Sequence, residues 1–502
     1  MSPWLVFAGV AALLLVAQVL YDRTQRAHAI VRNFPLLGRF RYWAEALGDP
    51  LRQYIVTGND EERPFSRDQR RWIYASAKRE NNYFGFGTDN DLEQTPSYLI
   101  IRHAAFPAPD RHDAAYTVPG AKVLGAWRRR KKAFRAPSIV NTSAMSFGAL
   151  SRTAVEAINR GVKLAGAMQN TGEGGISPHH RHGGDLVWQV GTGYFGCRDE
   201  RGRFSLERFL ETVASAPVRM IEVKLSQGAK PGLGGVLPAA KVTPEIARIR
   251  LVPLGQDCVS PATHGAFRDV DSMLDFLERL ADATGLPVGI KSAVGDLAFW
   301  EELARLMDST HRGPDFITID GGEGGTGAAP LVFSDHVALP FKVGFAQVYS
   351  VFAARGMAER VVFIGSGKLG FPEQSMLALA LGCDMINVGR EAMLAIGCIQ
   401  AQRCHTGHCP TGVATQNRWL LGGLDPTLKA ARLANYLTVL RKDLLALAHA
   451  CGELHPALVP LERFALLEGL RATPALEVFG YAPGHGALPA EEQAALRALM
   501  EA

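Results

Sequence analysis

Short apolar runs alternate with amphipathic segments along residues 136–395. Alternation of this kind indicates parallel strands joined by crossover helices. A further strand is expected near 167–170, and the pattern does not show where an eighth lies. The six clearest strand-like runs are 138–144, 220–224, 287–291, 316–320, 361–365 and 385–388. Helical periodicity falls between many of them, at 151–165, 270–285, 296–308 and 373–382.

This alternating region has about 260 residues, the size of a (β/α)₈ barrel. Its strand-like runs end in glycine-rich or polar sequence, as at 141–146, 224–228, 320–322 and 365–367. Ligand-binding loops at the carboxyl ends of many strands are typical of a barrel, whereas a doubly wound sheet concentrates its glycines after the first strand. We therefore predict the α/β class and a TIM-type barrel.

The N-terminus departs from the pattern of a soluble protein. Residues 4–20 read WLVFAGVAALLLVAQVL, broken only by Gln18. At about 1.5 Å per residue this stretch can just cross a hydrocarbon core of about 30 Å. Arg23, Arg26 and further arginines follow it, and no Lys or Arg precedes it. The positive-inside rule then places a single-pass protein with its main domain in the cytoplasm.

A cleaved secretory signal is the alternative, with a small-residue site at Ala27-His28-Ala29. Such a signal normally begins with basic residues, which are missing here. The expected organisation is therefore an anchor at 1–22, an adaptor region at 23–135 with helices at 41–56 and 66–79, a barrel domain at 136–455 and a tail at 456–502.

Charge gives little support for a nucleic-acid partner. The formal net charge is only +5 over 502 residues, and no basic stripe is interleaved with aromatic residues. Much of the charge lies in one run, 128–132, which reads RRRKK. We predict that this run is a solvated or membrane-proximal face.

Three of the seven cysteines fall within twelve residues, at Cys398, Cys404 and Cys409, and a proline follows the last. Closely spaced thiolates with this ending are typical of iron–sulfur loops, so 396–417 is predicted to hold a cluster. A zinc site that uses His405 or His408 as a fourth ligand is the rival, and three buried thiols without metal are a further one. The other cysteines are interpreted as structural. The histidines within 179–182 are not expected to form a metal site, because adjacent side chains diverge.

Three glycine-bearing loops follow successive predicted strands, at 320–327, 365–368 and 387–390. In barrels such loops bind phosphate, because glycine lets unpaired backbone N–H groups approach an anion. The loops predict a phosphorylated cofactor. The candidate residues are Gly322, Gly325, Gly365, Gly367, Gly389 and Arg390.

Charged residues stand among glycines in two other loops, NTGEGG at 170–175 and QGAKPGLGG at 227–235. Glu173 and Lys230 in these loops suit contact with a dicarboxylate or keto acid. Lys224 and Lys291, each at a strand end, are suited to stabilising negative charge on a reduced cofactor. For any one of these residues taken singly, a solvated loop charge is the better interpretation.

Six ordered motifs closely resemble the FMN-binding synthase domain of glutamate synthase. They are NTSAMSFGALS, NTGEGGISPHHR, EVKLSQGAKPGLGG, KVTPEIARIR, IDGGEGGTGAAP and CIQAQRCHTGHCPTGVATQ, and together they cover roughly 136–455. The resemblance implies a (β/α)₈ barrel with FMN at its C-terminal face and a 3Fe–4S cluster on Cys398, Cys404 and Cys409. It implies a keto-acid site at Glu173, Lys230 and Arg250. The flavin motifs contain Met145, Ser146, Gln189, Lys224, Gly322, Gly367 and Arg390.

The resemblance predicts an oxidoreductase that reduces 2-iminoglutarate to L-glutamate with hydride from FMN. Its partners would be a keto acid, ammonia and an electron-donor protein or subunit. The chain departs from the family at Ser2, where a glutaminase domain would have an N-terminal cysteine, so glutamine hydrolysis is not expected. Leu233 replaces a typical acid and Val236 a typical Gln. These two residues support a first alternative, an enzyme that acts on another substrate such as an N-substituted glutamate. A second alternative is a membrane electron-transfer subunit without substrate turnover.

Overall fold

The computed structural model describes residues 2–25 and 27–501. Met1, Ala502 and Arg26, one of the arginines behind the topology prediction, lie outside the described residues. The chain divides into two compact units, Met1–Arg71 and Trp72–Ala502. The boundaries predicted from the sequence for the anchor, adaptor, barrel and tail remain predictions.

The first unit is helical. It contains α1 (Pro3–Thr24), α2 (Ala29–Asn33), α3 (Leu37–Leu51) and a π-helical turn η1 (Arg52–Val56). Helix α4 (Arg67–Lys78) crosses into the second unit. Helices were expected at 41–56 and 66–79, and both are present. Among the described residues α1 is the one helix long and apolar enough to cross a membrane, and its apolar side chains are exposed.

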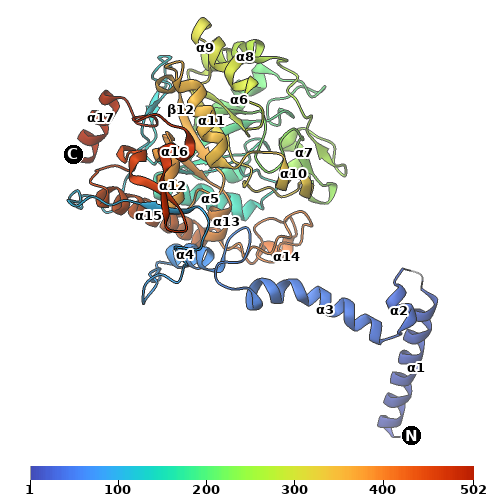
Figure 1. Ribbon diagram of the computed structural model, residues 1–502. Coiled ribbons are helices and arrows are strands. Elements are labelled where there is room, and N and C mark those ends of the chain that lie inside the picture. Colours follow the sequence, from blue (N-terminus) through green and yellow to red (C-terminus); the bar gives the residue numbers. More distant parts are fainter. Residues whose placement is uncertain (1, 26, 502) are drawn as a thin grey trace. The chain divides into compact units, whose positions relative to one another are not determined.

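The second unit is built on a closed barrel of eight parallel strands (Figure 1), so the predicted fold class is confirmed. Neighbours around the barrel follow chain order, and β13 closes the ring by pairing with β4. In chain order the strands are β4 (Val140–Thr142), β5 (Met168–Asn170), β6 (Asp185–Val190), β7 (Val218–Lys224), β10 (Val288–Ser292), β11 (Phe316–Asp320), β12 (Val362–Ser366) and β13 (Met385–Val388).

Strand β6 is the one that the sequence pattern did not reveal. It reads DLVWQV and follows β5 after only a glycine-rich loop and the short 3₁₀ turn η2 (Pro178–His180). No α-helix separates these two strands, so the usual alternation of strand and helix is interrupted. Inward-facing Gln189 further weakens its apolar signal.

Amphipathic helices make most of the other crossovers. Helix α5 begins at Ser151, whose hydroxyl accepts the Ala154 N–H, and ends at Gly166 in the left-handed region with φ 64°. The others are α6 (Leu206–Ala214), α8 (Val270–Thr284), α9 (Ala298–Thr310), α11 (Phe341–Ala353) and α12 (Pro372–Ala380).

Further elements decorate the barrel. Between β7 and α8 lie the hairpin β8 (Val236–Leu237) and β9 (Cys258–Val259), with the turn η3 (Ala239–Lys241) and α7 (Pro244–Arg250). Helix α10 (Leu331–His336) precedes α11, and α13 (Arg390–Ala395), α14 (Arg418–Leu421) and α15 (Pro426–Ala450) follow β13. A small sheet joins β1 (Tyr98–Ile101), β14 (Phe464–Glu468) and β15 (Arg471–Pro474), and α16 (Ala475–Phe479) and α17 (Ala490–Glu501) end the chain.

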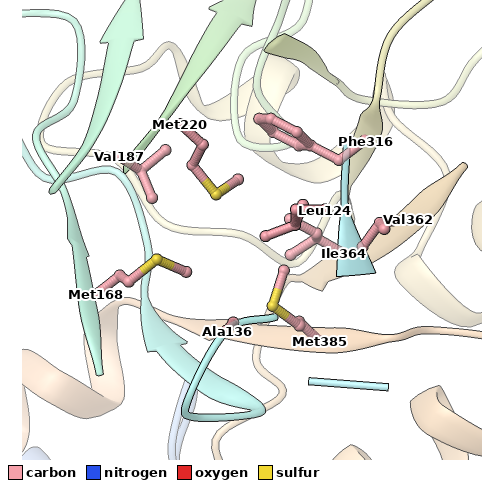
Figure 2. Close-up of a cluster of buried hydrophobic side chains, with 9 residues drawn as sticks. All are labelled: Leu124, Ala136, Met168, Val187, Met220, Phe316, Val362, Ile364 and Met385. Atoms are coloured by element: carbon pink, nitrogen blue, oxygen red, sulfur yellow. The ribbon is translucent and has the colours of Figure 1, made fainter. Parts of the chain in front are cut away.

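The amino end of the barrel is closed by a hairpin of β2 (Val123–Leu124) and β3 (Phe134–Arg135). Leu124 lies among the side chains at the starts of the strands, three of them the methionines Met168, Met220 and Met385 (Figure 2). Flexible thioethers fill an irregular space well. Because this end is filled with apolar side chains, polar chemistry is confined to the opposite, carboxyl end.

The prediction for the basic run 128–132 was wrong at two of its residues. Arg128 and Arg130 are buried at the amino end, where Arg130 forms ion pairs with Glu278 at 2.7 Å and with Asp315 at 2.9 Å. Burial lowers the pKa of Arg128. The carboxylates lie about 150 and 185 residues further along the chain, so nothing in the local pattern revealed them.

Candidate active site

The carboxyl ends of β5 and β7 bring an acid and a lysine into contact. Glu173 follows β5, Lys224 ends β7, and the Lys224 Nζ lies 2.9 Å from Glu173 Oε1. Burial acts to raise the pKa of Glu173, but the charges of Lys224, Arg250 and Lys230 outweigh it and the pKa lies below its usual value. Glu173 is therefore ionised at neutral pH, in a setting with more positive than negative charge.

Glycines hold the backbone tightly around this carboxylate. A Cβ on Gly191 would lie 2.6 Å from Glu173 Oε2, and a Cβ on Gly235 would lie 2.5 Å from Oε1. Any side chain at either position would displace the acid. Glycine is thus required for close approach here, and the acid is fixed between the end of β6 and the loop that follows β7.

Arg250 is a buried guanidinium that forms no ion pair with a carboxylate among the described residues. It ends α7, where its Nη2 donates to the Phe147 carbonyl at 2.9 Å and its Nη1 lies 3.7 Å from Cys258 Sγ. Its Nε has no partner. A buried cation without a carboxylate is costly, and a bound carboxylate is the natural compensation.

Lys230 lies in the glycine-rich loop between β7 and β8. Its Nζ donates to the Gly234 carbonyl at 3.2 Å, and burial and the nearby Lys224 lower its pKa. The loop packs closely against the residue that follows β11. A Cβ on Gly228 would lie only 1.8 Å from the Gly321 carbonyl oxygen. The structure thus brings Glu173, Lys230 and Arg250 together, and their role as a keto-acid site stays a prediction.

The two residues that depart from the family pattern lie on the solvent side of this loop. Leu233 is 39% exposed and Val236 is 47% exposed. Val236 pairs with Val259 across the β8–β9 hairpin. The rim is therefore apolar at the two positions where the resemblance led us to expect polar residues.

A second group of charges lies at the ends of β10 and β11. Asp320 is 3.4 Å from the Lys291 Nζ and accepts the Gly228 N–H at 2.9 Å. Burial opposes ionisation of Asp320, but Lys291 and this N–H prevail and lower its pKa. The sequence indicated Asp320 only as part of the glycine-rich segment 320–327, yet its carboxylate connects the end of β11 with the end of β10 and with the loop after β7.

The predicted cofactor glycines differ in what they do. Gly367, with φ +127°, needs glycine and lies against Gly321, while Gly389 precedes α13, and a Cβ there would lie 3.4 Å from Ser143 Cβ. A Cβ on Gly322 would lie 2.6 Å from the Ala338 carbonyl oxygen, and one on Gly325 would lie 2.4 Å from Arg390 Cδ. Four of the predicted glycines thus lie in loops at the barrel mouth.

Gly365 has a different role from the other glycines. Its Cβ position is filled by Leu369, Cys383 and Phe341, so packing of β12 against its helices already requires a glycine there. Half-buried Arg390 donates to the Glu323 carbonyl, and burial lowers its pKa.

The loop after β4 contacts the loop after β5. Met145 is buried, and a Cβ on Gly172 would lie 2.6 Å from the Ser146 backbone nitrogen. Above the strands, Ser143 Oγ lies 3.2 Å from Ser366 Oγ. Met145 and Ser146 therefore belong to the mouth, next to Glu173.

Gln189 points into the barrel and takes part in a network that the sequence did not predict. Its Nε2 donates to Glu222 Oε1 at 2.6 Å, as does Asn170 Nδ2 at 2.8 Å. The Thr318 hydroxyl donates to Glu222 Oε2 at 2.7 Å. The sequence signal that would have revealed this network is Glu222, an acid within the apolar strand MIEVK at 220–224. The network forms a polar floor beneath the mouth.

The cysteine loop 396–417 contains a near pair of thiols. Cys404 and Cys409 influence each other's charge, and burial raises the pKa of Cys404. Burial also opposes ionisation of Cys409, but N–H groups of Ala414, Thr411 and Val413 lower its pKa. In the described part of the chain no three His, Cys, Asp or Glu side chains are grouped to hold a metal. Cys398 is therefore not brought into a three-sulfur arrangement.

Lys241 links the cysteine loop to the segment between β7 and α8, and sequence reasoning missed it. It is buried in η3, and its Nζ donates to the carbonyls of Cys404 at 2.7 Å and Ala414 at 3.2 Å. Its buried positive charge lies beside Cys404 and Cys409. The only sequence signal was a lysine just before the helix start at Thr243-Pro244.

The histidines of 179–182 have separate partners, as expected for adjacent residues. His179 lies 3.1 Å from Glu245, and His182 lies 3.9 Å from Glu156. His180 is buried beside Ser177, and burial lowers its pKa to about 3. It is therefore neutral.

A surface hollow of about 490 Å³ lies away from these groups. It is lined by residues of α6 and α7 and of nearby loops, among them Arg181, Glu207 and Arg208. None of its lining residues belongs to the glycine loops or to the Glu173 group, so we place the candidate site at the mouth and not in this hollow.

A family model described as the conserved region in glutamate synthase matches residues 121–453. The glutamate synthase large subunit-like protein YerD of Bacillus subtilis is 38% identical over 467 residues, which cover 86% of this chain and 88% of that protein. An archaeal glutamate synthase (NADPH) of Methanocaldococcus jannaschii is 36% identical over 314 residues, 61% of this chain and 58% of that protein. Among solved structures, a flavocytochrome b2 variant with pyruvate bound shares 12% identity over 90% of each chain with a TM-score of 0.45, a level that supports no functional inference.

Proposed function

The chain belongs to the glutamate synthase family, and is thus an oxidoreductase of the glutamate synthase type; from this premise we propose that it reduces an imino acid formed from a keto acid and ammonia. The version closest to the family is reduction of 2-iminoglutarate to L-glutamate. The observation that carries the proposal is Arg250, a buried guanidinium that forms no ion pair in the described part of the chain and lies in the same group of charges as Lys230 and Glu173.

FMN is the proposed cofactor, and the mouth offers groups that suit it. The glycine-only conformation of Gly367, the position of Gly389 just before α13 and the cationic Arg390 suit a phosphate. Lys224, Met145, Ser146 and the loop containing Gly322 and Gly325 would surround the rest of the cofactor, above the floor formed by Gln189 and Glu222. When bound, FMN supplies the hydride that adds to carbon 2 of the imino acid.

The protein's own groups would bind and orient the substrate. Arg250 and Lys230 would each bind a carboxylate group, which offsets the cost of burying their charges. Glu173, held ionised by Lys224, would orient the imine nitrogen and exchange its proton. The glycines around Glu173 leave this acid little freedom, so the geometry is set before substrate arrives.

The flavin half and the substrate half are joined through Asp320. This acid contacts Lys291 and the N–H of Gly228, and Gly228 begins the loop that carries Lys230. A shift in the loop after β11 would therefore move Lys230 as well.

Another substrate is the first alternative, and the exposed apolar side chains of Leu233 and Val236 favour it. They leave the rim without the polar groups that the family places there, which suits a substrate with an added apolar group. A pure electron-transfer subunit is the second alternative. It would need neither Arg250 nor Lys230, so their burial beside Glu173 argues against it.

We further propose a 3Fe–4S cluster on Cys398, Cys404 and Cys409, with zinc as the rival metal. Support comes from the spacing of the cysteines, the closeness of Cys404 to Cys409 and the lowered pKa of Cys409. Binding would require Cys398 to approach the other two. The test is iron and zinc content of Cys404→Ser beside Cys451→Ser, a buried cysteine outside the loop. Loss of iron only in Cys404→Ser is expected, and one equivalent of zinc without iron in the wild type would overturn the cluster.

The proposal also covers the source of the electrons and the location of the protein. An electron-donor protein or subunit would deliver reducing equivalents, and α1 would anchor the enzyme as a single-pass protein with the barrel in the cytoplasm. The deciding experiment is reoxidation of the reduced, cofactor-loaded protein by a panel of keto acids with and without ammonia. Reoxidation that requires both a keto acid and ammonia is expected, and none with any pair would contradict the proposed reaction.

A further inference from the structure

Helix α3 presents an apolar stripe that the described residues of its own unit leave exposed. At about 100° per residue, the side chains of this stripe fall within an arc of about 120° on one side of the helix. They are between 40% and 79% exposed. The stripe consists of Leu37, Phe40, Trp43, Leu47 and Leu51.

The opposite side of α3 is occupied by α1 and α2, so the stripe faces away from both. A Cβ on Gly38 would lie 2.7 Å from the Ile30 carbonyl oxygen, which shows how closely α3 approaches α2. The Tyr42 ring lies 4.9 Å from the His28 ring. The polar flank of α3 is marked by an exposed ion pair between Arg41 and Glu45 at 2.9 Å.

An acid at the end of α1 ties the direction of α3 to that of α1. Asp22 accepts hydrogen bonds from Gln18 at 2.8 Å, from the Leu36 backbone N–H at 3.0 Å and from Arg39 at 2.6 Å. Its side chain is fully buried by these partners. Figure 1 shows α2 folded against the end of α1 and α3 leading away from it. The turn between the two long helices is therefore fixed, not a loose linker.

We propose that α3 lies in the surface of the bilayer that α1 spans, with its apolar stripe among the lipid headgroups and acyl chains. The inference rests on the membrane span in the proposed function and goes beyond it, because it assigns a second membrane contact and its residues. Three features favour lipid over a protein partner. The stripe follows the proposed span with one short helix, α2, between them. It mixes Trp and Phe with Leu, and arginines such as Arg32 and Arg52 lie near it in the sequence, where they can meet anionic headgroups.

A second copy of the chain or the barrel unit of the same chain would also be able to cover an apolar stripe. Both give protein contacts at the stripe, whereas the proposal requires lipid contacts there. A helix in the interface also keeps Arg41 and Glu45, on its flank, in water.

Photo-crosslinking in the full-length protein in native membranes separates these occupants. A benzophenone amino acid is placed singly at position 43 or 47 on the stripe, at 41 or 45 on the polar flank, and at 14 on α1. We expect lipid adducts with the probe at 14, 43 or 47 and no lipid adducts with the probe at 41 or 45. Lipid adducts at 14 with protein adducts at 43 and 47 would overturn this inference alone. Lipid adducts at 43 and 47 without any at 14 would uphold the surface contact and contradict the span.

Discussion

Two buried arginines at opposite ends of the barrel have contrasting surroundings. At the amino end, Arg130 is held by Glu278 and Asp315, and its positive charge is compensated within the protein. At the carboxyl end, Arg250 donates to a carbonyl and lies near a thiol, and within the described residues its Nε has no hydrogen-bond partner. Both side chains are almost fully removed from solvent, so burial alone does not distinguish them.

The difference supports a structural role for Arg130 and the proposed ligand-binding role for Arg250. A buried cation is tolerated where its charge is matched, and an unmatched one carries a cost that the fold must offset elsewhere. Active sites carry such costs because the ligand removes them on binding. The comparison therefore predicts opposite consequences for the same substitution at the two ends.

Arg130→Met should produce the largest loss of stability. It leaves Asp315 and Glu278 facing only Arg128, and removing one partner of a buried pair costs about 3–5 kcal/mol of unfolding free energy. Urea unfolding monitored by tryptophan fluorescence measures this change, with exposed Lys132→Ala from the same basic run as the control. The corresponding change Arg250→Met should alter the unfolding free energy by no more than about 1 kcal/mol. Equal losses for the two arginines would remove the distinction between them.

The pH dependence of substrate binding should report on Lys230. Burial and Lys224 lower the pKa of Lys230, and the side chain binds a carboxylate only while protonated. Keto-acid affinity should therefore be present below this pKa and be lost as pH rises through it. In Lys230→Arg the charge persists, so the loss should move to higher pH. Equilibrium titrations across alkaline pH test this, with exposed Lys163→Arg as the control. An unchanged profile in Lys230→Arg would assign the dependence to another group.

The smallest effect is expected at the rim of the site. Val236→Gln should strengthen 2-oxoglutarate binding about two- to ten-fold, since one hydrogen bond contributes roughly 0.5–1.5 kcal/mol. Leu254→Gln, at another exposed apolar position, is the control for general surface polarity. The same affinity in Val236→Gln as in the wild type would show that this departure from the family does not set substrate choice.

The sequence predicted the barrel because its strands are short β-branched runs between amphipathic helices. The pattern failed at β6, where a glycine-rich loop and a 3₁₀ turn take the place of a helix. It also failed at Arg130, whose partners are remote in sequence. Local patterns record periodicity well and long-range charge pairing poorly.

The candidate site was predicted less completely than the fold. Glu173, Lys230 and Arg250 were identified through motifs, and the structure brings them together. Glu222 and Lys241 were missed because an acid inside a strand and a lysine in a turn gain meaning only from their neighbours in space. The gathering of all three cysteines remains a prediction.

The central claim is that Arg250 binds the carboxylate of the substrate and leaves the cofactor alone. Titration of the flavin-loaded protein with the keto acid, followed through the flavin absorbance, tests it in wild type and Arg250→Ala. Hydrogen bonds to charged groups contribute about 1.5–3 kcal/mol, so Arg250→Ala should bind roughly ten- to hundred-fold more weakly. Its flavin content should equal that of the wild type. Loss of flavin with unchanged keto-acid affinity would contradict the account.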